Sequence, residues 1–161
     1  MARRGIRNRK DAMNWIKVRH GDLECALNKP QLEVLRAAEL ASPGRDIAED
    51  VISSVTARIR AEIAAGEVNA LDPDHSKIPP ELKECATSLA LEALQARIPA
   101  LDMPESIAKR ADLARETLRR VAASELPVTR PVCGIRAASK KGLSFGRARK
   151  GFFTSKNMEG L

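Results

Sequence analysis

The sequence predicts an all-α fold, a small helical bundle of about four to five helices with extended basic arms at its N- and C-termini. Between residues 22 and 126, apolar residues recur at spacings of three and four, and no stretch alternates with a sustained period of two. The same region contains no aromatic residue, so its core has to consist of leucine, isoleucine, valine and alanine. These side chains suit close helix–helix packing, which indicates a helical domain without a substantial sheet.

Charge divides the chain into three parts. Residues 1–21 contain seven lysines and arginines against one acid, and residues 127–161 contain eight against one. The middle, residues 22–126, contains thirteen against nineteen. The four aromatic residues lie in the outer parts, at positions 15, 145, 152 and 153. We therefore divide the chain into a basic N-terminal arm (1–21), an acidic helical domain (22–126) and a basic C-terminal tail (127–161).

Two helices are expected at the start of the helical domain. Asp22 is placed to cap the first helix, and Pro30 restarts the chain as a second helix. The second helix is expected to end at the Ser-Pro-Gly sequence of residues 42–44.

The third helix has the clearest pattern. Asp46 followed by Glu49 is typical of a capping box, in which the second acid reaches back to a free backbone N–H. Isoleucine and valine then recur every four residues from 47 to 63. Gly66 is expected to end this helix in the left-handed conformation.

Two further helices follow a polar loop. Pro79 and Pro80 predict the start of the fourth, whose broad stripe of small residues indicates burial on more than one side and which ends at Pro99. Asp102 and Glu105 predict a capped start for the fifth, and Pro127 ends the helical domain. The apolar stripe of the fifth helix is formed by Ile107, Ala111, Ala114, Leu118 and Val121, and an ion pair is expected between Glu116 and Arg120.

No group of residues predicts catalysis, a metal site or a cofactor site. The only histidines, His20 and His75, stand at no metal-ligand spacing from the three cysteines, and no glycine-rich phosphate loop is present. We expect reduced thiols, with Cys25 and Cys85 in the core and Cys133 in the tail. Because no apolar run has the length of a signal peptide or membrane span, we expect a protein assembled in the cytosol, without a membrane partner.

The arms are the candidate partner-binding segments. The candidate residues in the N-terminal arm all carry a positive charge, which is typical of segments that bind phosphates or acidic protein surfaces. They are Arg3, Arg4, Arg7, Arg9 and Lys10. Those in the tail combine charge with aromatic rings: Arg147, Arg149, Lys150, Phe152 and Phe153. Such a tail suits either the groove of a protein partner or single-stranded nucleic acid, whose bases stack on rings. A purely solvating tail is the third alternative, which its apolar content disfavours.

Trp15 has two interpretations. It either packs onto the helical domain or serves as a further contact point for a partner. Packing is favoured, since tryptophan is strongly buried on average.

The order of these residues resembles a known family. The run includes Trp15 and Val18, Asp22-Leu23, Leu27-Asn28, residues 32–36, Asp50-Val51-Ile52, Ile59-Arg60, Asn69 and, as its most specific part, Ile78-Pro79-Pro80-Glu81-Leu82-Lys83. It is similar to the head–tail connector proteins of tailed bacteriophages, also called head-completion or adaptor proteins. The likeness covers roughly residues 15–130, and the ending with Phe152-Phe153 and Met158 to Leu161 also looks like termini of that family.

The resemblance implies a structural protein of the virion neck, assembled in the host cytoplasm. Copies of such a protein form a ring, typically a dodecamer, beneath the portal protein. The ring extends the channel for the packaged DNA and offers a platform to the tail or to a stopper (head-closure) protein. The family has no catalytic residues.

A nucleic-acid-binding accessory module is the alternative function. In that case the basic arms contact phosphates directly, and binding falls steeply as salt is raised because counterions are released.

Overall fold

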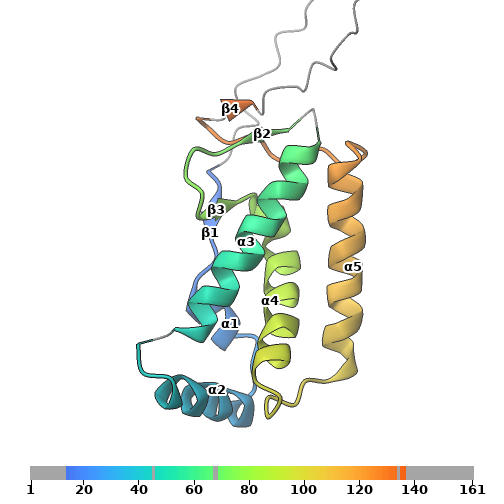
Figure 1. Cartoon of the computed structure of the whole chain (residues 1–161). Coiled ribbons are helices and arrows are strands. Elements are labelled where there is room, and N and C mark those ends of the chain that lie inside the picture. The colour runs from blue at the N-terminus through green and yellow to red at the C-terminus, as the bar shows by residue number, and fades with distance from the viewer. Residues whose placement is uncertain (1–13, 45, 67–68, 134, 137–161) are drawn as a thin grey trace, which may run out of the picture.

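The computed structural model describes residues 14–44, 46–66, 69–133 and 135–136. In this part of the chain three long helices, α3, α4 and α5, run along the body, and α2 lies across one end (Figure 1). The only strands among these residues are two residues long, and they form two separate antiparallel pairs, β1 with β3 and β2 with β4. The predicted all-α fold class is confirmed.

The elements follow the chain in a simple order. They are β1 (Ile16–Lys17), α1 (His20–Glu24), α2 (Lys29–Ala41), α3 (Ile47–Ala65), β2 (Ala70–Leu71), β3 (Lys77–Ile78), the 3-10 turn η2 (Pro80–Leu82), α4 (Lys83–Arg97), α5 (Glu105–Ala122) and β4 (Ile135–Arg136).

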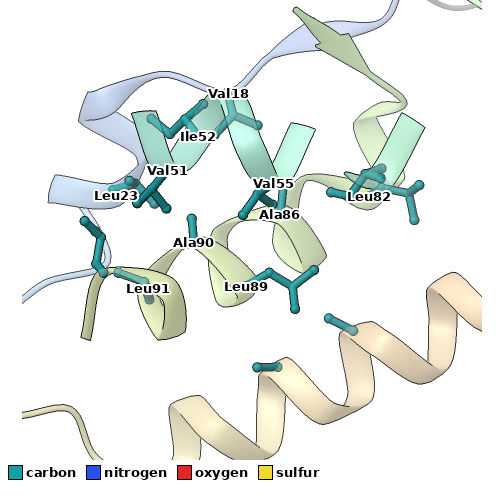
Figure 2. Close-up of a cluster of buried hydrophobic side chains, with 14 of the residues drawn as sticks. Val18, Leu23, Val51, Ile52, Val55, Leu82, Ala86, Leu89, Ala90 and Leu91 are labelled. Carbon is teal, nitrogen blue, oxygen red and sulfur yellow. The ribbon is translucent and has the colours of Figure 1, made fainter. Parts of the chain in front are cut away.

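Helix α4 is the centre of the packing. It contacts α3, α5 and α1, as its broad stripe of small residues predicts. Ala86 and Ala90 lie against Val51 and Val55 of α3, whereas Leu89 points toward α5 (Figure 2). Small side chains allow the α4 and α3 backbones to approach closely, and each large aliphatic side chain buried around them contributes about 1.5–3 kcal/mol.

Helix α5 buries the predicted stripe but begins differently from the prediction. All five predicted core positions, from Ile107 to Val121, are buried. The capping box expected from Asp102 and Glu105 is wrong, because Pro104 is the N-cap and no side chain caps the helix. The predicted pair of Glu116 with Arg120 is also wrong: Glu116 pairs with Arg119 at 3.4 Å.

Helix α3 begins with half of its predicted capping box. Asp46 Oδ1 accepts a hydrogen bond from the backbone N–H of Glu49 at 2.8 Å. The Glu49 carboxylate does not complete the box. It instead lies 3.5 Å from Lys17 Nζ, which joins the start of α3 to β1.

Gly66 ends α3 for a reason other than the predicted one. Its backbone is extended (φ −77°, ψ 115°), so the left-handed conformation expected here is wrong. A Cβ atom at this position would lie 2.8 Å from the Val121 carbonyl oxygen of α5. Glycine is therefore needed because the backbone passes so close to α5.

Asp22 supports α1 from within its first turn. The N-cap is Arg19, whose backbone N–H donates to Asp22 Oδ2 at 2.8 Å, so the expectation that Asp22 itself caps the helix is wrong. Lys83 Nζ lies 2.7 Å from Asp22 Oδ1. The Lys83 contact and the Arg19 N–H lower the pKa of Asp22 below its ordinary 3.8.

The cysteines are free thiols. Cys25 is exposed, so its predicted core position is wrong, because α1 ends just before it and buries only Leu23. Cys85 is half-buried at the edge of the core, and Cys133 is exposed.

The body is longer than the predicted helical domain. Trp15 and Val18 are buried upstream of residue 22, and Val128 is buried downstream of residue 126. Residues of both basic segments therefore complete the core of the helical domain.

Candidate interaction surfaces

Most of the predicted partner-binding residues lie outside the described part of the chain. These are Arg3, Arg4, Arg7, Arg9 and Lys10 in the N-terminal arm, and Arg147, Arg149, Lys150, Phe152 and Phe153 in the tail. Trp15, the remaining candidate, is 3% exposed. Its burial confirms that it packs onto the helical domain.

Trp15 links the two segments from which the basic arms extend. Its indole N–H donates a hydrogen bond to the Thr129 carbonyl oxygen at 2.9 Å, across 114 positions of sequence. The Thr129 backbone N–H donates in turn to the Glu81 carboxylate. These contacts hold the described end of the N-terminal arm beside the described start of the C-terminal tail.

The short strand pairs complete this junction. β1 follows Trp15 and pairs with β3, with Ile16 opposite Ile78. β4, the last described element, pairs with β2, with Ile135 opposite Leu71. β2 and β4 lie at the end of the bundle opposite α2, and β1 and β3 lie below them beside α3 (Figure 1). The first and the last described residues of the two basic segments therefore lie on the same side of the body.

Arg60 is the buried support beneath this end. It is 7% exposed, and its guanidinium donates to the carbonyl oxygens of Asp72, Asp74 and Lys77 at 2.6 to 3.0 Å. Its Cζ atom lies 5.6 Å from the centre of the Trp15 ring, within the range of a cation–π contact. Burial lowers the pKa of Arg60, which the charges of Asp72 and Asp74 oppose.

The loop that Arg60 holds presents acidic groups to solvent. Asp74 accepts hydrogen bonds from the hydroxyl and backbone N–H of Ser76, at 2.7 and 3.0 Å, and lies 3.3 Å from Lys77. The Ser76 bonds and the Lys77 contact lower the pKa of Asp74 to about 2. This carboxylate is therefore ionised in the physiological range.

A groove of about 930 Å³ runs between α4 and α5. Its lining mixes acids with bases, Glu81 and Glu84 with Lys83 and Arg110, and Leu113 on its rim is 69% exposed. Cys85 also lines it, and burial raises the pKa of that thiol. A raised pKa keeps the thiol protonated, so Cys85 is not an activated nucleophile.

Sequence reasoning missed two arrangements. The arms' common origin depends on the Trp15–Thr129 contact and the strand pairs, for which the sequence has no local signal. The structure also places His20 beside Glu39 and Asp46, which are 19 and 26 positions away in the sequence. Carboxylates at such separations are too common in sequences to be recognised as partners.

The chain matches no protein-family model, no curated protein and no solved structure. Among the described residues, no helix combines the length and the apolar character needed to cross a membrane.

Proposed function

We propose that the chain is a head–tail connector (adaptor) subunit of a tailed bacteriophage or prophage. In this role copies form a ring beneath the portal protein, extend the channel for the packaged DNA, and join the head to the tail or stopper protein. The observation that carries the proposal is the common origin of the two basic arms at one end of a helical body. The resemblance over residues 15–130 supplies the identity of the partner.

The distribution of charge supports this role. The residues 22–126 carry six more acids than bases, whereas the segments 1–21 and 127–161 are strongly basic. A ring of acidic bodies repels duplex DNA from its walls, which lets the DNA slide through. The basic arms are then free to bind an acidic surface of a partner on one side of the ring.

The most specific part of the resemblance has a defined structural role. In the run from Ile78 to Lys83, Ile78 and Leu82 are buried, and Lys83 reaches Asp22 of α1. The Glu81 carboxylate accepts a hydrogen bond from the backbone N–H of Thr129, near the start of the tail. Together with the pairing of Ile78 opposite Ile16, these contacts connect the central helix to both basic segments.

Capture by the cognate portal protein tests the proposal. The full chain is compared with variants ending after Arg136 and beginning at Asn14, which keep every described contact of Thr129 and β4. We expect the portal to capture the full chain but not the variant that ends after Arg136. Electron microscopy of the captured complex should show a ring on the portal.

Two matched tail variants separate charge from aromatic anchoring. Aromatic and arginine side chains dominate most interfaces, so Phe152→Ala with Phe153→Ala should weaken portal capture at least tenfold. Replacing Arg147, Arg149 and Lys150 with glutamine should weaken it mainly at low salt. Portal capture that is unchanged in both variants and in both truncations would overturn the role of the arms.

Duplex and single-stranded DNA serve as parallel baits for the alternative function. DNA capture that falls with the logarithm of salt, at a slope of about −0.9 per phosphate contacted on duplex DNA, would show direct phosphate binding. If that capture occurs without any portal binding, the nucleic-acid module replaces the connector. If neither bait captures the full chain, both functions are rejected.

A further inference from the structure

We propose that His20, Glu39 and Asp46 form a binding site for a divalent transition-metal ion of the zinc class, which clamps α2 to the body. The three residues come from three different elements: His20 begins α1, Glu39 lies near the end of α2, and Asp46 is the N-cap of α3. One ligand atom from each lies within 4.8 Å of the others. This inference is independent of the connector function.

The spacing of the ligand atoms fits one ion. His20 Nε2 lies 3.2 Å from Glu39 Oε1. Two ligands bound to one tetrahedral zinc at about 2.1 Å stand about 3.4 Å apart. The contact between His20 and Glu39 therefore already has the separation that a shared ion requires. An oxygen of Asp46 lies within 4.8 Å of both, and one Asp46 oxygen also caps α3 by accepting from the Glu49 N–H.

The second ring nitrogen of His20, Nδ1, has a carboxylate near it. Nδ1 lies 3.9 Å from Glu24 Oε2, and Arg36 lies 3.3 Å from the other oxygen of the same carboxylate. A metal-bound histidine usually donates its remaining ring N–H to a carboxylate, which fixes the ring. Glu24 lies on that side of the ring, but at 3.9 Å its carboxylate has to move closer before it can accept the Nδ1 proton.

Charge favours a cation at this position. Glu24, Glu39 and Asp46 bring three negative charges, and Arg36 brings one positive charge among the contacts described here. The N-terminus of α3 opposes a cation, because the helix dipole places partial positive charge there. This repulsion is weaker than the attraction of the ligand carboxylates, which bind the ion directly.

The ligand types select the class of metal. One imidazole with two carboxylates suits zinc and its first-row neighbours. Calcium and magnesium prefer six or more oxygen ligands, which these residues do not supply. Three protein ligands leave a fourth position for water.

Helix α2 is the element that gains most from such a clamp. Leu35 is its only fully buried residue, and Gln31 ties its start to the Asp102 carbonyl oxygen at 2.7 Å. The metal would hold the other end of α2, through Glu39, to α1 and α3. Metal binding should therefore change the protection of α2 more than that of α4.

Calorimetric titration of the tag-free, chelator-treated full chain with Zn²⁺ tests the site, with Mg²⁺ as the control ion. We expect one zinc per chain and no comparable magnesium binding. His20→Gln should weaken zinc binding at least 100-fold, Asp46→Asn at least tenfold, and Glu24→Gln about tenfold. The matched control His75→Gln, which removes the other histidine, should bind zinc as the original chain does.

Two further measurements keep the test decisive. Cobalt(II) should bind with the weak visible bands of nitrogen and oxygen ligands and without a thiolate charge-transfer band, and Cys25→Ser should leave its affinity unchanged. Amide exchange should slow in α2 on zinc addition, in the original chain but not in His20→Gln. Zinc binding that survives His20→Gln, or no binding tighter than millimolar by the folded chain, would overturn the proposal.

Discussion

The two ends of the bundle are held by polar contacts of opposite character. At the end where the arms leave, Arg60 is almost fully buried and donates to three backbone carbonyl oxygens. At the α2 end, the ion pair of Arg36 with Glu24 and the contact of His20 with Glu39 involve side chains that are 24% to 60% exposed. Water can replace the exposed side-chain contacts at the α2 end, but it cannot reach the buried hydrogen bonds of Arg60.

This difference has a consequence for how the molecule is expected to open. A buried donor or acceptor that loses its partner costs about 1–3 kcal/mol, whereas an exposed ion pair contributes about 0–1 kcal/mol. The arm end should therefore open only when the whole domain unfolds. The α2 end should open locally, with Leu35 as its main apolar attachment.

Arg60→Met should have the largest effect on stability. It leaves the carbonyl oxygens of Asp72, Asp74 and Lys77 without their donor and removes the contact with Trp15. We expect the free energy of unfolding to fall by about 4 kcal/mol in urea titrations. Arg58→Met is the matched control, since Arg58 lies on the same helix and is exposed, and it should change stability by less than about 0.5 kcal/mol. Equal effects of the two variants would contradict the importance of burial.

Leu35→Ala should weaken the α2 end by about 3 kcal/mol, since it removes the only fully buried side chain of that helix. Because α2 opens locally, this loss of stability should appear as an increase of about 150-fold in the amide exchange rate of α2, with a smaller increase in α4. Leu40→Ala on the same helix is the control. Leu40 is 83% exposed, so its removal should leave exchange unchanged. Uniform acceleration of exchange in all helices would show that α2 is not a separate unit.

Gly66→Ala should cost about 2 kcal/mol, because the new methyl group meets the Val121 carbonyl oxygen at 2.8 Å and the Asn69 side chain at 3.0 Å. Asn69 is itself constrained, since its Oδ1 accepts a weak bond from Val128 and its Nδ2 is buried without a partner among the described residues. Gly21→Ala in α1 is the control. Nothing lies within 4 Å of a Cβ there, so stability should stay equal or rise by up to about 1 kcal/mol. If Gly66→Ala leaves stability unchanged, the C-terminal end of α3 lies farther from α5 than described here.

The same glycine shows what the sequence can and cannot predict. Helical spacing predicts the helices and the stripe of α5, because each helix buries one face and periodicity is a local property. The end of α3 at Gly66 is predicted as well, but its cause is the backbone of α5, more than 50 positions away. Contacts of this kind depend on how helices pack, and periodicity does not specify packing.

The candidate surfaces follow the same division. Composition alone identifies the arms as basic segments, and it favours burial of Trp15. The common origin of the arms and the grouping of His20 with Glu39 and Asp46 arise from tertiary structure. Polar partners far apart in the chain have no periodic signal, so sequence reasoning finds them only when they form a known spacing.

Asp22→Asn should have the smallest effect and the clearest dependence on pH. Asp22 pairs with Lys83 at 2.7 Å, and this contact and the Arg19 N–H lower its pKa below 3.8 in the folded chain. The stabilisation is therefore fully present above pH 3.8 and is lost as the pH falls through the folded pKa. We expect the variant to be about 1 kcal/mol less stable than the original chain near neutral pH.

That difference should shrink as the pH falls below 3.8, because protonation then removes from the original chain the charge that the variant lacks. Urea unfolding of both proteins across this range measures it, with Glu33→Gln, an exposed acid on α2, as the control. A difference that stays constant down to the acid limit would show that the effect does not come from the charge of Asp22. A difference that vanishes would show that an ion pair links α1 to α4. The contribution of this pair to stability is small because it is partly exposed, like the ion pairs that hold the α2 end.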